Sequence, residues 1–396
     1  MKRITNWCTV ATGMLMAILP QTGLLAADDP IESLMQEPRY YDTAEADIQL
    51  RVIASGLDHP WSIRWLPDGT TLVTEKNAGV IRRIVDDELL EEPVLGGPQD
   101  LVFGRYKGVL DVAPHPDFEN QPWLYVSYNK DLGDNREAVA VARGRWDGTN
   151  IQGLEDIFVA QEGTVNGLRL LFGTDGMLYL GVYVPGGPSP DDFDTLSQEG
   201  KILRLTPEGE IPADNPFVGR DDFLPEIYSY GHRTPTGLTM NRQTGEIWNT
   251  EMGPLGGDEV NRVVRGGNYG WPLVSLGRRY DGPWQSEHFQ MEGVIDPVHF
   301  WMPGISPSSL VFYESDEIPA WEGDLFVSAQ QEGRIPGTGQ LQRIKLNDDG
   351  NEIMRERLFD DLGQRIRDVK LGPDGRLWLL TDEDNGLVMR IEPAGN

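Results

Sequence analysis

The stretch LGPDGRLWLLTDEDNGLVMRI, residues 371–391, decides the fold, because its pattern recurs along the chain. An apolar run leads into the pair Asp374 and Gly375, a second apolar run carries Trp378, and a third carries Arg390. An Asp-Gly pair between apolar runs signals a tight hairpin, in which the pair supplies the positive φ angles of the turn. The unit therefore predicts three antiparallel strands in succession.

Five further copies of this unit lie along the chain, two of them close (WLPDGTTLV and FGTDGMLYL) and three looser. They occupy residues 65–84, 113–128, 172–205, 241–248 and 321–346. Six repeats of short strands, with few helical patterns, predict an all-β fold: a six-bladed β-propeller of four-stranded antiparallel blades. We expect the strand at 51–54 to close the ring by pairing with the last unit. A β-sandwich explains the strands but not the repeat.

Residues 1–27 (MKRITNWCTVATGMLMAILPQTGLLAA) have the pattern of a cleaved secretory signal peptide. Lys2 and Arg3 precede an apolar run that is too short to span a membrane and that ends at small residues. We expect an acidic N-terminal arm at 28–47, ordered structure from about residue 48, and a single propeller domain over 48–396. The expected location is periplasmic or secreted.

The composition excludes several classes of partner and site. The chain carries 34 basic and 63 acidic side chains, a net charge of −29, which argues against nucleic acid or an anionic membrane as partner. Its one cysteine, Cys8, lies in the leader, so the mature chain has no disulfide, thiolate metal site or cysteine nucleophile. We expect no membrane insertion. The electron acceptor and the assembly, a homodimer among the options, stay open.

Two polar features are candidates for a site. The glycine-rich stretch at 230–272 (YGHRTPTGLTMNRQTGEIWNTEMGPLGGDEVNRVVRGGNYGWP) contains Arg233 and suits the presentation of backbone carbonyls to a hard cation. The alternative is two tight turns of a β-protein. Arg365 and Arg367 alternate along one strand and so face the same side, where they could bind carboxylates bidentately. The alternative is an exposed strand face paired with the surplus acids.

The order of short motifs over residues 57–393 resembles the soluble PQQ-dependent sugar dehydrogenases, which are the glucose/sorbosone and aldose sugar dehydrogenases. Each motif is weak alone, whereas the ordered set is specific. The motifs are Pro60-Trp61, Leu66-Pro-Asp-Gly69, Gly108-Val-Leu-Asp-Val, His115-Pro-Asp-Phe118, Gly200-Lys-Ile-Leu-Arg204, Asp214-Asn-Pro-Phe217, Gly231-His-Arg233, Thr250-Glu251, Gly253-Pro254, Gly256-Gly-Asp-Glu259, Asn268-Tyr-Gly-Trp-Pro272, Arg365-Ile-Arg-Asp-Val369 and Asp374-Gly375.

The resemblance implies a propeller that holds PQQ over its channel and oxidises the anomeric hydroxyl of a sugar, or a related alcohol, to a lactone or carbonyl product. It implies Ca²⁺ on the backbone carbonyls of Gly253 and Pro254. The implied cofactor-binding positions are Arg233, Thr234, Arg365 and Arg367. The cofactor would carry the redox chemistry and the protein would orient and polarise it.

The sequence departs from the family pattern where the family has its general base. That histidine begins a His-x-Gly-x-Arg-Leu segment, which here is VNGLRL and begins with Val165. Met252 and Thr234 also replace the usual His and Asn, and residues 106–108 and 182–185 differ as well. An aliphatic side chain cannot accept a proton, so a contribution of roughly 10²–10⁴-fold should be missing unless another group supplies it.

Three hypotheses follow. The first is an active dehydrogenase with an altered base, and the second is a catalytically impaired propeller that binds a ligand. The third, a Ca²⁺-dependent lactonase, rests on analogy between propellers alone.

Overall fold

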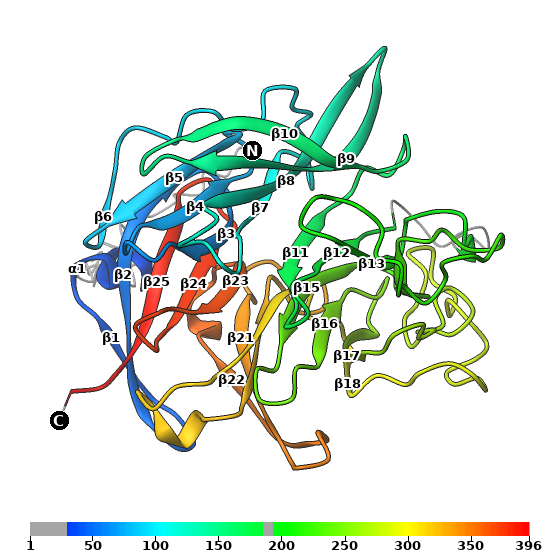
Figure 1. Ribbon diagram of the computed structural model, residues 1–396. Helices are drawn as coiled ribbons and strands as arrows, with labels where there is room; N and C mark the ends of the chain where they lie inside the picture. The colour runs from blue at the N-terminus through cyan, green and yellow to red at the C-terminus, as the bar shows by residue number, and fades with distance from the viewer. Residues whose placement is uncertain (1–29, 185–192, 396) are drawn as a thin grey trace, which may run out of the picture.

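The computed structural model describes residues 30–184 and 193–395, which form six antiparallel sheets arranged around a central axis (Figure 1). This arrangement confirms the six-bladed β-propeller. The expected signal peptide, residues 1–27, lies outside the described residues. In the described part, no helix is long and apolar enough to cross a membrane.

Each blade is given from its innermost strand outward. Blade 1 contains β3 (Pro60–Trp65), β4 (Thr71–Glu75), β5 (Val80–Val85) and β6 (Glu88–Leu89). Blade 2 contains β7 (Val109–Pro114), β8 (Trp123–Gly133), β9 (Arg136–Trp146) and β10 (Ile151–Val159). Blade 3 contains β11 (Leu168–Phe172), β12 (Leu178–Val182), β13 (Lys201–Leu205) and β14 (Ile227–Tyr230).

Blade 4 contains β15 (Pro235–Met240), β16 (Ile247–Glu251), β17 (Asp258–Val263) and β18 (His299–Trp301). Blade 5 contains β19 (Pro307–Phe312), β20 (Leu325–Ala329), β21 (Gln340–Leu346) and β22 (Glu352–Leu358). Blade 6 contains β23 (Ile366–Leu371), β24 (Leu377–Thr381), β25 (Gly386–Pro393), β2 (Asp47–Leu57) and β1 (Arg39–Asp42). Short helical segments are α1 (Pro30–Gln36) and two 3₁₀ turns (Pro319–Trp321 and Asp360–Leu362).

Blade 6 joins the two ends of the chain. Strand β2 pairs with β25, with Arg51 opposite Arg390 and Ala54 opposite Val388, which confirms the expected ring closure. Ordered structure begins earlier than we expected, because α1 and β1 both precede residue 48 and β1 adds a fifth strand to the blade. Glu45 ties this segment to blade 5 by ion pairs with Arg343 and Lys345.

The Asp-Gly turns differ from the expected two-residue turn. Gly375 alone has a positive φ (72°), while Asp374 accepts a hydrogen bond from the backbone N–H of Arg376 (3.2 Å). Gly69 and Gly176 repeat this arrangement with φ of 91° and 72°. The Asp therefore serves through its side chain as a turn cap, and the Gly through its backbone.

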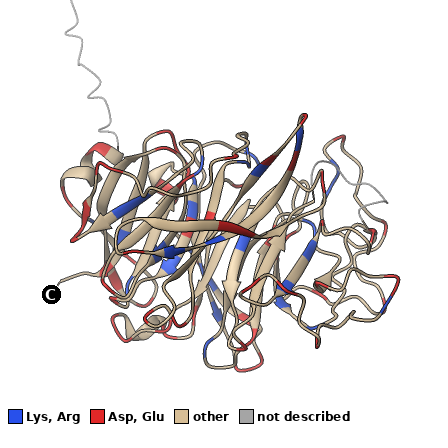
Figure 2. Ribbon diagram, turned by 45° about the horizontal axis from the view of Figure 1, so that its top comes forward, with Lys and Arg blue, Asp and Glu red and all other residues tan. Residues whose placement is uncertain are grey.

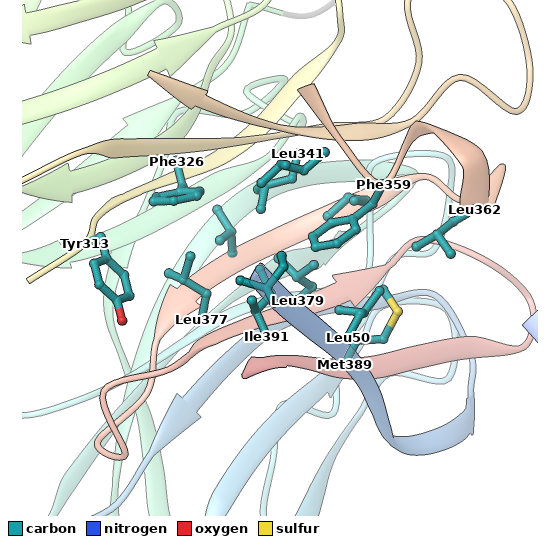
Figure 3. Packing of buried hydrophobic residues seen from close by; sticks show 14 of the residues in the cluster. Leu50, Tyr313, Phe326, Leu341, Phe359, Leu362, Leu377, Leu379, Met389 and Ile391 are labelled. Carbon is teal, nitrogen blue, oxygen red and sulfur yellow. The ribbon is translucent and has the colours of Figure 1, made fainter. Parts of the chain in front are cut away.

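Apolar side chains fill the spaces between blades. Figure 3 shows Phe326 and Leu341 of blade 5 facing Leu377, Leu379 and Met389 of blade 6. In the view of Figure 2, acidic residues are spread over many loops, and several Lys and Arg residues lie along strands. Buried area of this kind stabilises the fold by about 25 cal/mol per Å².

The innermost strands β3, β7, β11, β15, β19 and β23 line the axis, each in contact with the next around the ring. In blades 1 to 5 the innermost strand is the first of its blade in sequence. In blade 6 the innermost strand β23 is preceded in sequence by β1 and β2, which close the ring. The N-terminal ends of the innermost strands therefore share one end of the channel with the loops between the second and third strands of every blade. We call this end the channel mouth.

Candidate functional site

A pocket of about 440 Å³ lies at the channel mouth between blades 1 and 6. Its lining residues are His59, Lys76, Asn77, Gly104, Arg105, Tyr106, Arg365, Arg367, Asp382 and Glu383. Two larger hollows lie elsewhere: one of about 460 Å³ at the opposite end of the channel, and one of about 760 Å³ beside β18 and β22. The size of the mouth pocket suits a small organic ligand.

Arg365 and Arg367 meet at one carboxylate in this pocket. Both contact Asp382, and Nη2 of Arg365 lies 3.3 Å from its carboxylate. Burial alone would raise the pKa of Asp382, but the two guanidiniums hold that pKa below its usual range. Arg367 is buried and lies 4.0 Å from the ring centre of Trp61. Its Nε has no hydrogen-bond partner among the described residues. A buried cation with an unused donor is suited to an anionic ligand.

Arg233 is held on the other side of the mouth. Its Nη1 donates to the carbonyls of Met252 (2.9 Å) and Gly253 (3.0 Å), and its Nη2 donates to the hydroxyl of Tyr280 (3.3 Å). Thr234 lies beside it and accepts a longer bond from Nη1 (3.4 Å). Arg233 does not line the pocket of Arg365 and Arg367. The sequence-predicted cations thus divide into two groups at one end of the channel.

The corner at Gly253 and Pro254 is closely packed. A Cβ on Gly253 would lie 2.2 Å from the carbonyl oxygen of Gly256, so this backbone path requires glycine. Asp258 fixes the corner by accepting the N–H of Gly253 (2.9 Å). Pro254 is buried, and nothing in the described ranges donates to its carbonyl, so that oxygen is available to a cation. The Gly253 carbonyl has a second lone pair beyond the one that Arg233 uses.

Metal ligands of another type are not gathered here. Across residues 30–184 and 193–395, no group of three or more His, Cys, Asp or Glu side chains is placed to hold a metal. A hard cation at this end would therefore rely on carbonyl oxygens.

Buried acids lie beneath the corner. Burial raises the pKa of Glu251 to about 7 and that of Asp258 to about 6, and burial together with the charge of Glu251 raises the pKa of Glu259. His232, the histidine of the opening motif, is also buried, and burial lowers its pKa to about 3. It stacks on Tyr269 and serves the packing of the site.

The stability of the protein should fall as pH rises through this acid cluster. A raised pKa means that the folded state holds the proton more tightly than the unfolded state, so the stabilisation is present below pH about 4.5 and is lost by about pH 7. We expect a change on the order of 1–3 kcal/mol, because one pKa unit corresponds to about 1.4 kcal/mol. Glu251→Gln should flatten the dependence of the melting temperature on pH between 4.5 and 7.5. An unchanged slope in that variant would contradict the assignment.

A further arginine, Arg169, crosses the channel below the mouth. It is 2% exposed, and its Nε donates to the carbonyl of Thr236 (2.9 Å). Its Nη1 donates to the carbonyl of Trp61 (3.3 Å), and its Nη2 donates to those of Ser308 (3.0 Å) and Arg367 (3.4 Å). Blade 3 thereby bonds to the innermost strands of blades 1, 4, 5 and 6. The guanidinium closes the channel and forms the base of the mouth.

The comparisons with known proteins place the chain in a family. Residues 57–390 match the family described as Glucose / Sorbosone dehydrogenase. The chain belongs to this family. It is 34% identical to the aldose sugar dehydrogenase YliI of Escherichia coli (strain K12) over 361 residues, 88% of this chain and 94% of that protein.

Solved structures of family members agree with the fold. The apo-form of the soluble aldose sugar dehydrogenase from Escherichia coli superimposes with a TM-score of 0.81 at 33% identity, covering 88% of this chain and all of that one. The PQQ-bound form of the aldose sugar dehydrogenase from Streptomyces coelicolor gives 0.69 at 26% identity, covering 89% of this chain and 100% of that one.

In this glucose/sorbosone dehydrogenase family member, the backbone of Val165 is fixed by a hydrogen bond. Its carbonyl accepts a hydrogen bond from Asn129 (2.6 Å). Tyr183 packs against Gly167, two residues further along, where a Cβ would lie 1.8 Å from the tyrosine ring. Burial raises the pKa of Tyr183 to about 12, so its phenol stays protonated and cannot serve as a base at neutral pH. Neither residue supplies a proton acceptor.

Sequence reasoning missed four residues of this end. In the sequence, Arg169 was used only to align the VNGLRL segment, and Lys76 and Tyr183 were not singled out. His59, which precedes the Pro60-Trp61 motif, was not singled out either. The local sequence carries no signal for the channel contacts. The apolar-Asp-Gly repeat does mark the innermost strands, because the Asp-Gly turn directly follows the innermost strand of its blade.

Proposed function

We propose that this protein is an exported PQQ- and calcium-dependent sugar dehydrogenase that oxidises an aldose or a related alcohol to a lactone or carbonyl product. The observation that carries the proposal is the pocket in which Arg365, Arg367 and Lys76 gather at the channel mouth. PQQ is a quinone that carries several carboxylates, and guanidinium groups bind carboxylates bidentately. The proposal is in keeping with the PQQ-bound family member that shares the fold.

The residues of the mouth take the following roles in this proposal. Arg365 and Arg367 bind cofactor carboxylates, and Asp382 orients the two arginine side chains. Arg233, with Thr234 beside it, polarises the quinone. The carbonyls of Gly253 and Pro254 hold Ca²⁺. When bound, PQQ supplies the hydride acceptor, and the chain positions the sugar's anomeric carbon against it.

Calorimetry of the metal-free, cofactor-free protein with PQQ, with and without Ca²⁺, tests the binding half of the proposal. Tight binding that strengthens with Ca²⁺ is expected. The loaded protein should then reduce an artificial dye with at least one sugar from a broad aldose panel. Binding without turnover on any sugar would favour the second candidate, a ligand-binding propeller, for which Val165 at the base position is the specific observation.

The Gly253 corner gives a prediction about Ca²⁺. Gly253→Ala should weaken the Ca²⁺ dependence of PQQ binding by more than about tenfold, since the added Cβ meets the Gly256 carbonyl and displaces the corner. Gly282→Ala is a matched control, because nothing lies within 4 Å of a Cβ at that position. Because Gly282 has a positive φ, its replacement by alanine lowers stability, but it leaves the Gly253 corner unchanged. Equal Ca²⁺ dependence in the two variants would contradict the placement.

Export and the electron acceptor are separate parts of the proposal. Residues 1–27 have the signal-peptide pattern that supports export to the periplasm or beyond. N-terminal sequencing of the protein recovered from outside the cytoplasm should begin after residue 27. The natural electron acceptor is not needed for the activity test, because an artificial dye takes its place.

A further inference from the structure

The proposed reaction needs a proton acceptor, and Val165 cannot be one. Among the five histidines, His232 and His299 are weak bases, because burial lowers their pKa values to about 3 and about 4. His115 lines the hollow at the opposite end of the channel, and His288 is exposed in the insertion before β18. His59 alone lines the pocket that contains Arg365 and Arg367.

The imidazole of His59 is oriented by its neighbours. Its Nδ1 lies 2.9 Å from Oδ1 of Asp58, and a second carboxylate, Asp384, lies 3.6 Å away. Asn77 Nδ2 donates to the same Asp58 oxygen (3.3 Å) and also lies 3.0 Å from Nδ1. In the tautomer in which Nδ1–H donates to Asp58, the Nε2 lone pair is left to accept a proton. Within the described ranges, Nε2 makes no hydrogen bond.

The backbone of His59 is held in an uncommon conformation. Its φ is 50°, in the left-handed region, and it immediately precedes Pro60. Two bonds hold it there: its N–H donates to the carbonyl of Glu383 (3.0 Å) and its carbonyl accepts the N–H of Lys76 (3.2 Å). Non-glycine residues are uncommon in this region and cluster at functional sites. Blades 6 and 1 together therefore fix the position of this ring at the mouth.

Charged groups face the ring from both blades. Asp58 and Asp384 lie against Nδ1, and the pocket that His59 lines also contains Lys76, Arg105, Arg365, Arg367, Asp382 and Glu383. Lys76 itself is occupied as a donor to Asn77 and to the carbonyl of Gly104 (3.3 Å), and burial lowers its pKa. Lys76 thus acts on the ring through Asn77 rather than as the acceptor.

We propose that His59 is the proton acceptor of the dehydrogenation, in place of the histidine that the family has at position 165. This inference rests on the proposed function. The O–H bond of the sugar breaks and its proton goes to Nε2. The C–H bond breaks with its electron pair, and the quinone of PQQ would be the acceptor of that hydride. The alcohol carbon is oxidised by two electrons as its C=O bond forms. Asp58 stabilises the imidazolium.

A first test follows the ring without turnover. In ¹⁵N-labelled protein, the imidazole signals that vanish in His59→Gln belong to His59. We expect an Nδ1–H tautomer in the cofactor-free protein and a shift of the His59 signals on addition of PQQ and Ca²⁺, while the His288 signals stay in place. PQQ that binds by calorimetry and leaves the His59 signals unmoved overturns the inference but leaves the proposed function standing.

The second test uses the loaded enzyme. His59→Gln should lower kcat by about 10²–10⁴-fold with an unchanged Kd for PQQ, and His288→Gln should not. Asp58→Asn should lower kcat less than His59→Gln does, because the ring keeps its Nε2 lone pair but loses the carboxylate that orients it. A kcat of His59→Gln within twofold of wild type overturns the inference. Should the wild-type protein oxidise no sugar, the proposed function fails, and the inference with it.

Discussion

Replacing Arg169 with leucine is expected to lower the free energy of unfolding by about 3–5 kcal/mol. Arg169 is buried, and its guanidinium donates to carbonyls on four other blades. Its removal leaves those carbonyls without a donor inside the channel, and it leaves Asp368, fully buried at 3.7 Å from Nη1, with less positive charge beside it. Unpaired buried polar groups cost about 1–3 kcal/mol each, so the loss is large.

Urea denaturation of both proteins measures this difference. Arg169→Lys should fall between wild type and leucine, because one ammonium keeps the charge but cannot reach four blades at once. Arg242→Leu is the matched control. Its side chain is 76% exposed and its pairing with Glu314 is at the surface, so a change within about 0.5 kcal/mol is expected. A loss under 1 kcal/mol for Arg169→Leu would show that the channel bonds are replaced by water.

Arg367→Leu should weaken PQQ binding by about 10²–10³-fold. Removing one member of a buried charged contact costs about 2–5 kcal/mol, and each 1.4 kcal/mol is a factor of ten. Leucine also leaves Asp382 without its nearest cation, and that carboxylate then repels an anionic ligand. Calorimetric titration with PQQ in the presence of Ca²⁺ measures the change.

A control separates the loss of binding from a loss of folding. Arg357→Leu removes an arginine from the outer groove beside β22, where it pairs with Glu332 at 2.8 Å, and should leave PQQ affinity unchanged. Melting temperatures of both variants are recorded beside the titrations. If Arg367→Leu remains folded and binds PQQ as wild type does, the cofactor does not use this pocket.

The repeat of apolar runs around Asp-Gly pairs was enough to predict the propeller and its closing strand. Each unit encodes its own hairpin locally, and the register follows from a turn that the Asp side chain caps. The start of ordered structure was predicted wrongly, because α1 and β1 lack an apolar period. Glu45 ties their segment to blade 5 instead through ion pairs with Arg343 and Lys345.

The site was harder to predict than the fold. Arg365 and Arg367 follow from strand alternation, because two residues of one strand share a face. The bonds of Arg169 join residues that are up to 198 positions apart, and only the closed ring brings them together. The left-handed backbone of His59 is likewise set by contacts from Glu383 and Lys76, and neither is readable from the neighbouring Pro60.

Ring closure also dictates an order of events during folding. Ile48 pairs with Pro393 and Arg51 with Arg390, so β2 can pair with β1 on one edge early, but its other edge has no partner until residues 386–393 are made. Blades 1 to 5 can each form from contiguous sequence, whereas blade 6 must wait. Contacts of such long sequence separation slow folding and leave an unpaired strand edge exposed in the meantime. Loss of β25 would therefore leave one edge of β2 open and prone to association.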